Sequence, residues 1–254
     1  MNPDLMQTPF QGHFADVNGL KMYYEIYGDG TPLILLHGFT DSTVVWHPFI
    51  DEFAKHFRII VPDLRGHGRS LDLTNQFTLA QVALDVFILL DQLGIGQFKA
   101  IGVSAGGCSL LYMASQQPAR LEAIILESSP AYFSEQALAT LLAGVTDEVL
   151  DLHPQRHYYL QGSDQIRSLI NQLPKIYDSY NTHPPSLSKI TAKTLIVWGD
   201  RDELFPVAMA VEMYTVIANA YLWVAPNAGH GLGPADQYAG VFTQTALEFL
   251  QNEW

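Results

Sequence analysis

A glycine-rich stretch near the middle of the chain constrains the fold more than any other sequence feature. Residues 102–107 read Gly-Val-Ser-Ala-Gly-Gly and match the pattern G-x-S-x-G. An apolar segment over 98–101 predicts a buried strand before this stretch, and a helical segment begins at Cys108. Strand, sharp turn and helix are the context in which this pattern presents a serine nucleophile, here Ser104. The pattern alone also fits a glycine-rich turn that packs a helix against a sheet.

The segments around this stretch alternate between strand and helix. Asn18-Gly19 between two alternating segments predicts a hairpin, and unbroken apolar runs predict strands buried on both faces. We therefore expect an α/β fold with a mostly parallel twisted sheet flanked by helices. The predicted strands are 14–17, 20–27, 33–36, 57–61, 98–101, 121–126, 194–198 and 220–224, and the predicted helices include 43–54, 78–93, 207–217 and 236–250.

The alternation stops between the sixth and seventh predicted strands. Residues 130–189 contain no buried strand pattern, but they contain helical stretches and five of the twelve tyrosines. We expect a small helical cap over 130–189, inserted into a core formed by 1–129 and 190–254. The predicted cap helices are 134–143, 146–152 and 163–173.

Composition excludes several classes of function. The formal net charge of −13 disfavours nucleic acid and anionic membranes as partners, since both would be repelled. Neither a signal peptide nor an apolar run of membrane-spanning length is predicted, and the single cysteine, Cys108, cannot form an intramolecular disulfide. We expect a soluble cytoplasmic protein. The sequence is compatible with a homo-oligomer and does not specify the oligomeric state.

A serine nucleophile at neutral pH needs a base, and the base needs an orienting acid. When a serine follows a strand in this way, the chain order is serine, acid, histidine. Of the four histidines after Ser104, three lie in the predicted cap or its linker: His153, His157 and His183. His230 follows a predicted sheet strand between two glycines and is therefore the predicted base.

Three carboxylates are candidates for the acid. We rank Asp202 first, because it follows a strand end directly, then Asp200 and then Glu127. Asp200 is better suited to bracing its own turn. For the oxyanion hole we expect the backbone N–H groups of Ala105 and Phe39.

Taken together, these motifs resemble the α/β-hydrolase superfamily of esterases, lactonases, cofactor-free haloperoxidases and C–C bond hydrolases. The resemblance covers about residues 15–251 and favours Asp202 over Asp200 as the acid. The matching pieces stand in the superfamily's order: His37-Gly38-Phe39, the loop 63–70 (Asp-Leu-Arg-Gly-His-Gly-Arg-Ser), 102–107, Gly199-Asp200-Arg201-Asp202 and Gly229-His230.

The resemblance implies a serine hydrolase that cleaves a small carboxylic ester or lactone and uses no cofactor. Ser104 stands where the family's haloalkane dehalogenases and epoxide hydrolases carry aspartate, which favours acyl chemistry. Residues 38–43 lack the Gly-Pro-Gly of C–C hydrolases of ring-cleavage products. A perhydrolase, a C–C hydrolase, an amidase and a slow-turnover receptor remain alternatives.

Aromatic residues near the predicted site are candidates for the substrate pocket. Trp46 and the tyrosines of the predicted cap could line it, and Tyr132 and Phe133 are the first candidates because they follow the strand that ends at Glu127. His153 and His157 have a spacing that could present two metal ligands, but no third ligand is evident nearby, so no metal site is predicted.

Overall fold

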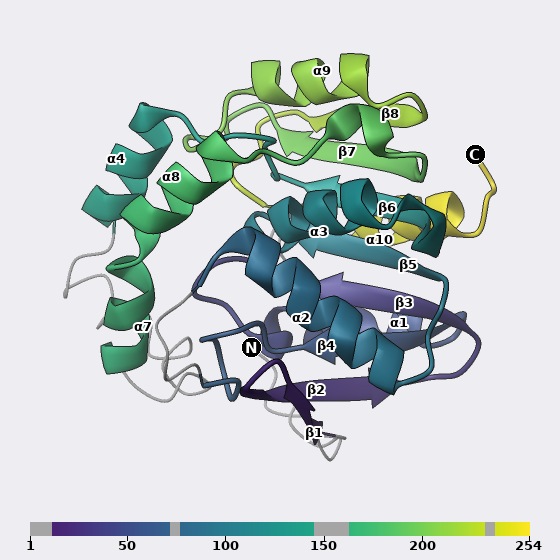
Figure 1. Ribbon diagram of the computed structural model, residues 1–254. Coiled ribbons are helices and arrows are strands. Elements are labelled where there is room, and N and C mark those ends of the chain that lie inside the picture. The colour runs from purple at the N-terminus through teal and green to yellow at the C-terminus, as the bar shows by residue number, and fades with distance from the viewer. Residues whose placement is uncertain (1–11, 72–76, 145–162, 232–236) are drawn as a thin grey trace.

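The computed structural model describes residues 12–71, 77–144, 163–231 and 237–254. Eight strands form one sheet in the order β1-β2-β4-β3-β5-β6-β7-β8 (Figure 1). β1 pairs antiparallel with β2 and β2 with β4, whereas all later neighbours are parallel, which confirms the expected fold class. The strands are β1 (Gly12–Val17), β2 (Leu20–Tyr27), β3 (Thr31–Leu36), β4 (Phe57–Pro62), β5 (Phe98–Val103), β6 (Leu121–Glu127), β7 (Lys193–Gly199) and β8 (Ala220–Ala225).

The predicted hairpin forms where the sequence places it. Asn18 and Gly19 both have positive φ, at 49° and 76°, as a two-residue turn between twisted strands requires. The strands then pair from Val17 opposite Leu20 outward.

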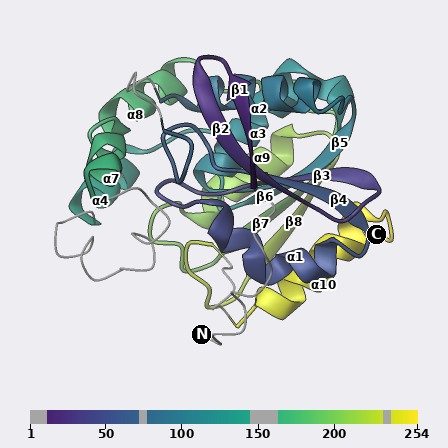
Figure 2. The same ribbon diagram turned by 90° about the horizontal axis from the view of Figure 1, so that it is seen from below.

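Helices cover both faces of the sheet (Figure 2). One face carries α1 (His47–Phe53) and α10 (Ala239–Leu250); the other carries α2 (Leu79–Gln92), α3 (Ala105–Gln116) and α9 (Val207–Val216). In β3, Leu33 and Leu35 belong to the core under α1 and α10, whereas Ile34 and Leu36 belong to the core under α2 and α3. This alternation explains why an unbroken apolar run makes a central strand. Short 3₁₀ turns lie at Thr43–Trp46, Pro118–Arg120 and Leu187–Lys189.

Three described helices lie between β6 and β7, at one end of the sheet (Figure 1). They are α4 (Glu135–Gly144), α7 (Ser163–Ile170) and α8 (Leu173–Thr182). The predicted helix 163–173 is wrong at its end, because α7 ends at Ile170 and a second helix begins at Leu173. Pro174 has no N–H to donate to the carbonyl of Ile170, so it fits only the first turn of a new helix. The predicted helix 146–152 lies outside the described residues, as does the start of the last predicted helix at 236.

The helices of this insertion are joined to the core by amide side chains. Gln165 donates from Nε2 to the carbonyl oxygen of Gly66 at 2.7 Å, and Gln172 Oε1 accepts from the N–H of Phe77 at 2.8 Å. On α8, Asn181 accepts from the N–H of Phe133 and donates to its carbonyl oxygen, both at 2.8 Å. These bonds fix α7 and α8 against loops that follow the carboxyl ends of the strands.

The start of α3 lies unusually close to the sheet. A Cβ atom on Gly106 would be 2.4 Å from the carbonyl oxygen of Leu36 and 2.5 Å from that of His37. A Cβ on Gly102 would be 2.6 Å from the Cα of Gly107. Since all these neighbours are backbone atoms, they cannot rotate away, and the glycines are required for the turn between β5 and α3.

We predict that Gly106→Ala destabilises the fold by about 3 kcal/mol, because the added methyl group overlaps backbone that cannot relax locally. Gly240→Ala is the matched control: it lies in α10 with nothing within 4 Å of the added atom, and should stabilise the protein by about 0.5 kcal/mol. Urea unfolding of both variants measures the difference. Equal stability of the two would contradict the close approach.

Candidate active site

Ser104 lies at the tip of the turn between β5 and α3. Its φ of 51° and ψ of −120° are strained for a residue with a side chain. Its N–H donates to the carbonyl oxygen of Glu127 at 2.8 Å, and its carbonyl oxygen accepts from the N–H of Cys108 at 2.9 Å. The backbone on both sides of the serine is therefore held, and the hydroxyl projects from a fixed point.

His230 connects this hydroxyl to a carboxylate. Its Nε2 lies 3.0 Å from Ser104 Oγ, and its Nδ1 lies 2.9 Å from Asp202 Oδ2. A carboxylate can only accept, so Nδ1 carries the proton and Nε2 presents a lone pair to the serine O–H. The structure thus brings the three predicted catalytic side chains together in one hydrogen-bonded series.

Asp202 is buried, with its side chain 1% exposed. Its Oδ1 accepts from the N–H groups of Leu204 and Phe205 at 2.9 and 3.0 Å. Burial by itself raises the pKa of this carboxyl, but the bond to His230, the charge of that residue and the two N–H donors outweigh burial, and the pKa lies below its usual value. The Asp202 carboxylate therefore stays charged and can stabilise the imidazolium form of His230.

The other two candidate acids have different positions. Asp200 Oδ1 accepts from the N–H of Ala228 at 3.3 Å, so this side chain joins the turn after β7 to the histidine loop. Glu127 ends β6, and its backbone carbonyl holds Ser104. Nδ1 of His230 bonds to Asp202 rather than to either of them.

The two predicted oxyanion donors flank Ser104. Ala105 is the first residue of α3, so its N–H points out of the helix without an intrahelical acceptor. A Cβ on Gly38, the residue before Phe39, would lie 3.6 Å from Ser104 Cβ. The segment after β3 therefore passes beside the serine, with Phe39 next along it.

Two buried imidazoles support that segment. His37 donates from Nδ1 to the carbonyl oxygen of Gly38 at 2.8 Å and accepts at Nε2 from the N–H of Leu64 at 2.9 Å. His67 lies 5.2 Å from the His37 ring and 5.5 Å from that of Phe39. Burial, with the neighbouring His67, lowers the pKa of His37 to about 3, and burial lowers that of His67 to about 4. Both rings are neutral near pH 7.

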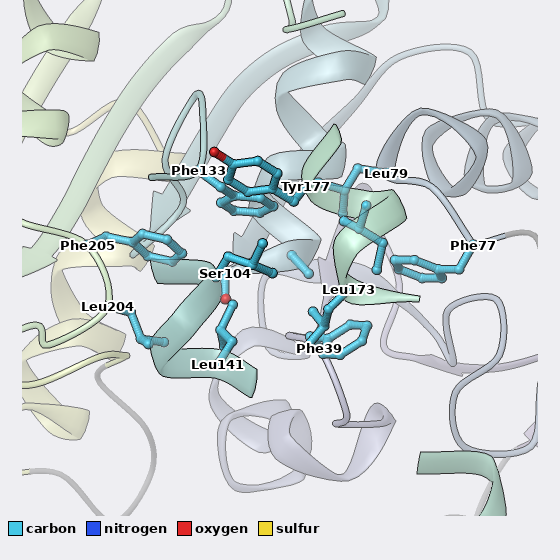
Figure 3. A pocket seen from close by; sticks show the side chains of 13 residues that line it. Phe39, Phe77, Leu79, Ser104, Phe133, Leu141, Leu173, Tyr177, Leu204 and Phe205 are labelled. Atoms are coloured by element: carbon cyan, nitrogen blue, oxygen red, sulfur yellow. The ribbon is translucent and has the colours of Figure 1, made fainter. Parts of the chain in front are cut away.

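A cavity opens directly above Ser104 (Figure 3). It encloses about 500 Å³, including its open mouth, and eleven of its thirteen lining residues have hydrocarbon side chains. Ser104 and Tyr177 supply the two hydroxyl groups. The lining residues are Phe39, Phe77, Leu79, Ser104, Ala105, Phe133, Leu138, Leu141, Leu173, Ile176, Tyr177, Leu204 and Phe205.

Of the three predicted pocket residues, only Phe133 lines this cavity. The prediction for Trp46 is wrong: it is 2% exposed and packs against Phe49 in the core under α1 and α10. The prediction for Tyr132 is also wrong, because the residue is 39% exposed and its hydroxyl donates to Glu212 Oε2 at 3.1 Å. Phe133, the next residue, packs inward against the rings of Tyr180 and Phe205.

Sequence reasoning missed most of the cavity wall. The residues from α4 and α8 have ordinary helical spacing, which does not distinguish a cavity wall from a core. Phe205 could have been found, since it follows Asp202 closely and precedes Pro206.

Within 12–71, 77–144, 163–231 and 237–254, no three His, Cys, Asp or Glu side chains gather as metal ligands. His153 and His157 lie outside these ranges. No helix in the same part of the chain has the length and apolar character needed to span a membrane.

Comparison with known families agrees with this geometry. A family model described as the alpha/beta hydrolase fold matches residues 31–157, half of the chain. The chain belongs to the α/β-hydrolase fold family. Within the family it is 38% identical over 109 residues to a soluble epoxide hydrolase of Corynebacterium sp. strain C12, covering 43% of this chain and 38% of the relative.

Solved α/β-hydrolases superpose over nearly the whole chain. A meta-cleavage product hydrolase from Pseudomonas fluorescens IP01 gives a TM-score of 0.84 at 20% identity, covering 96% of this chain and 98% of that one. A thermophilic esterase from Thermogutta terrifontis gives 0.77 at 25% identity, covering 95% and 98%. These relatives support hydrolase activity.

The neutral histidines predict acid sensitivity. An imidazole whose pKa is lower in the folded state stabilises the fold above the unfolded pKa of about 6.5, and this stability is lost as pH falls. We expect the free energy of unfolding to fall by about 1–3 kcal/mol per pH unit below pH 6.5. His67→Phe should make this slope shallower and the exposed His56→Gln should not, as measured by urea unfolding from pH 7 to 5. A pH-independent stability would contradict the prediction.

The Asp202–His230 bond predicts the effect of an isosteric change. Asp202→Asn can still accept from the two N–H groups, but its amide would donate to His230 Nδ1. The proton would then sit on Nε2 and face Ser104, so serine-dependent turnover should fall about 10³–10⁴-fold with the fold intact. Ester hydrolysis and circular dichroism test this. A loss below tenfold would mean that Asp202 does not set the tautomer.

Proposed function

We propose that the protein is a serine hydrolase that cleaves a small carboxylic ester or lactone through an acyl-enzyme intermediate. The observation that carries the proposal is the hydrogen-bonded series Ser104–His230–Asp202, in which Ser104 also lines an apolar cavity. A nucleophile, a base and an orienting acid at hydrogen-bond distance are what acyl transfer requires.

In the proposed first half-reaction, Ser104 Oγ attacks the carbonyl carbon while its proton passes to His230 Nε2. Asp202 stabilises the imidazolium that forms, since it is charged and fully hydrogen-bonded. The N–H groups of Phe39 and Ala105 hold the oxyanion, and each such donor is typically worth about 3 kcal/mol of the barrier. Collapse of the intermediate expels the alkoxide, which takes the proton from His230.

In the second half-reaction, His230 removes a proton from water, and the resulting hydroxide attacks the acyl carbon. The second tetrahedral intermediate collapses, Ser104 leaves with the proton returned by the imidazole, and the carboxylic acid is released. Each role in this cycle belongs to a group of the chain itself, so the proposal requires no metal or organic cofactor.

The nature of the nucleophile favours ester chemistry over epoxide opening. A serine forms an acyl-enzyme that water can hydrolyse at its carbonyl carbon, whereas an alkyl-serine ether would have no such carbon. The superposition on an esterase at 25% identity supports the same choice. The apolar lining fits a modest alkyl or aromatic acyl group, since each buried CH₂ contributes about 0.8 kcal/mol.

We also propose that the helices between β6 and β7 act as a cap that selects the substrate. Five cavity residues come from α4 and α8, namely Leu138, Leu141, Leu173, Ile176 and Tyr177. A substrate in the cavity would contact these side chains, and the size of the cavity favours a small molecule over a polymer.

The test is hydrolysis of p-nitrophenyl esters of rising acyl length by wild type, Ser104→Ala and Ser109→Ala. Ser109 is the matched control: a buried serine on α3 whose hydroxyl donates to the carbonyl oxygen of Ala105. We expect turnover that depends on acyl length, falls at least about 10³-fold in Ser104→Ala and survives in Ser109→Ala.

Two outcomes would redirect the assignment. Negligible turnover of all esters by folded wild type would leave a simple esterase untenable, and a panel of γ- and δ-lactones would then be measured with the same variants. Turnover that persists in Ser104→Ala would exclude Ser104 as the nucleophile.

A further inference from the structure

Phe205 occupies a position between the proposed base and the cavity. Its ring centroid lies 5.4 Å from that of His230 at an interplanar angle of 63°, in edge contact with the imidazole. The same side chain lines the cavity beside Ser104 (Figure 3). It is therefore in contact both with the base and with the space that a substrate would fill.

The backbone of Phe205 is fixed from two sides. Its N–H donates to Asp202 Oδ1 at 3.0 Å, and its carbonyl oxygen accepts from the indole N–H of Trp198 at 2.7 Å. Trp198 is fully buried in β7, and Phe205 is 2% exposed. The ring thus starts from a rigid anchor, and its direction depends on what packs against it.

Phe133 packs against the ring of Phe205. The two rings are stacked at 5.6 Å with an angle of 16°, and Phe133 also contacts Tyr180 at 4.9 Å. Asn181 bonds both the N–H and the carbonyl oxygen of Phe133. Both Tyr180 and Asn181 belong to α8, so the contacts run without a break from α8 to His230.

We propose that Phe205 is a positioning residue for His230, and that α8 sets the orientation of the Phe205 ring through Phe133 and Asn181. The proposal rests on the proposed function, since it concerns the base of that reaction. Packed aromatic rings have few alternative arrangements, so removing one lets its neighbour turn. An imidazole that turns out of line with Ser104 slows proton transfer while the cavity still binds substrate.

The proposal separates kcat from KM. Phe205→Leu should lower kcat about ten- to hundredfold, because His230 loses the ring that holds it in line. Asn181→Ala, which leaves both rings in place, should lower kcat about three- to tenfold. In both variants KM should change less than threefold relative to wild type for a short ester such as p-nitrophenyl acetate.

Phe87→Leu is the matched control. Phe87 is equally buried but lies on α2 against Phe98, and it does not line the cavity. Phe87→Leu removes the same atoms from the core as Phe205→Leu, so thermal unfolding of the two variants compares their stability. The kcat of Phe87→Leu should stay within twofold of wild type. Asn181→Ala keeps the proposal testable if Phe205→Leu does not fold.

A spectroscopic readout distinguishes positioning from general loosening. The Nδ1 proton between His230 and Asp202 is in a charge-assisted hydrogen bond and is expected at low field in the proton NMR spectrum. It should shift or broaden in Phe205→Leu and Asn181→Ala and remain in Phe87→Leu. The assignment is made by its absence in His230→Gln.

The outcomes separate the two proposals. If wild type shows no Ser104-dependent turnover, the proposed function fails, and the NMR comparison still tests whether Phe205 positions His230. If kcat of Phe205→Leu stays within twofold of Phe87→Leu, or only KM changes, or the Nδ1 resonance is unaffected, then Phe205 does not position the base.

Discussion

The close approach of α3 to the sheet is the constraint on which the rest of the site depends. At Gly106 the backbone lies so near the end of β3 that a methyl group would overlap two carbonyl oxygens. To reach this contact the chain makes a sharp turn after β5, and at this turn Ser104 has a positive φ. The same turn exposes the N–H of Ala105 at the start of α3. The positions of the proposed nucleophile and of one proposed oxyanion donor thus both depend on this close contact.

The parallel strands gather the other groups at one edge. Phe39 follows β3, Ser104 follows β5, Asp202 follows β7 and His230 follows β8, so residues far apart in sequence meet where the carboxyl ends of these parallel strands lie on the same side of the sheet. The acid and histidine loops are then bonded to each other, because Arg201 donates its N–H to the carbonyl oxygen of Ala228 at 2.8 Å. Backbone contacts therefore set the distance between the acid and the base.

The hydrogen-bonded series of Ser104, His230 and Asp202 lies directly beside the apolar cavity, because Ser104 also lines that cavity. Asp202 is kept charged by two N–H donors and His230, although it is buried. On the other side of Phe205 the cavity wall is hydrocarbon. The Asp202 side chain is 1% exposed, and Phe205 packs against His230. Electrostatic interactions are stronger where water is excluded, so the bond between Asp202 and His230 is strengthened by this burial. The helices α4 and α8 supply part of the cavity wall, and α8 contacts Phe205 through Phe133.

Local sequence determined the parts of the structure that depend on near neighbours. The Asn18-Gly19 hairpin, the strand–serine–helix turn and the alternation of the core follow from turn chemistry and periodicity over a few residues. Chain order and the family resemblance then selected His230. The sequence also ranked Asp202 first among the candidate acids, and the tertiary structure places its carboxylate against His230 Nδ1. Only the tertiary structure showed that Trp46 lies in the core and Tyr132 at the surface. An aromatic side chain is equally apolar in a core, in a cavity wall or on a surface, so its place depends on contacts with distant segments, which sequence periodicity does not contain.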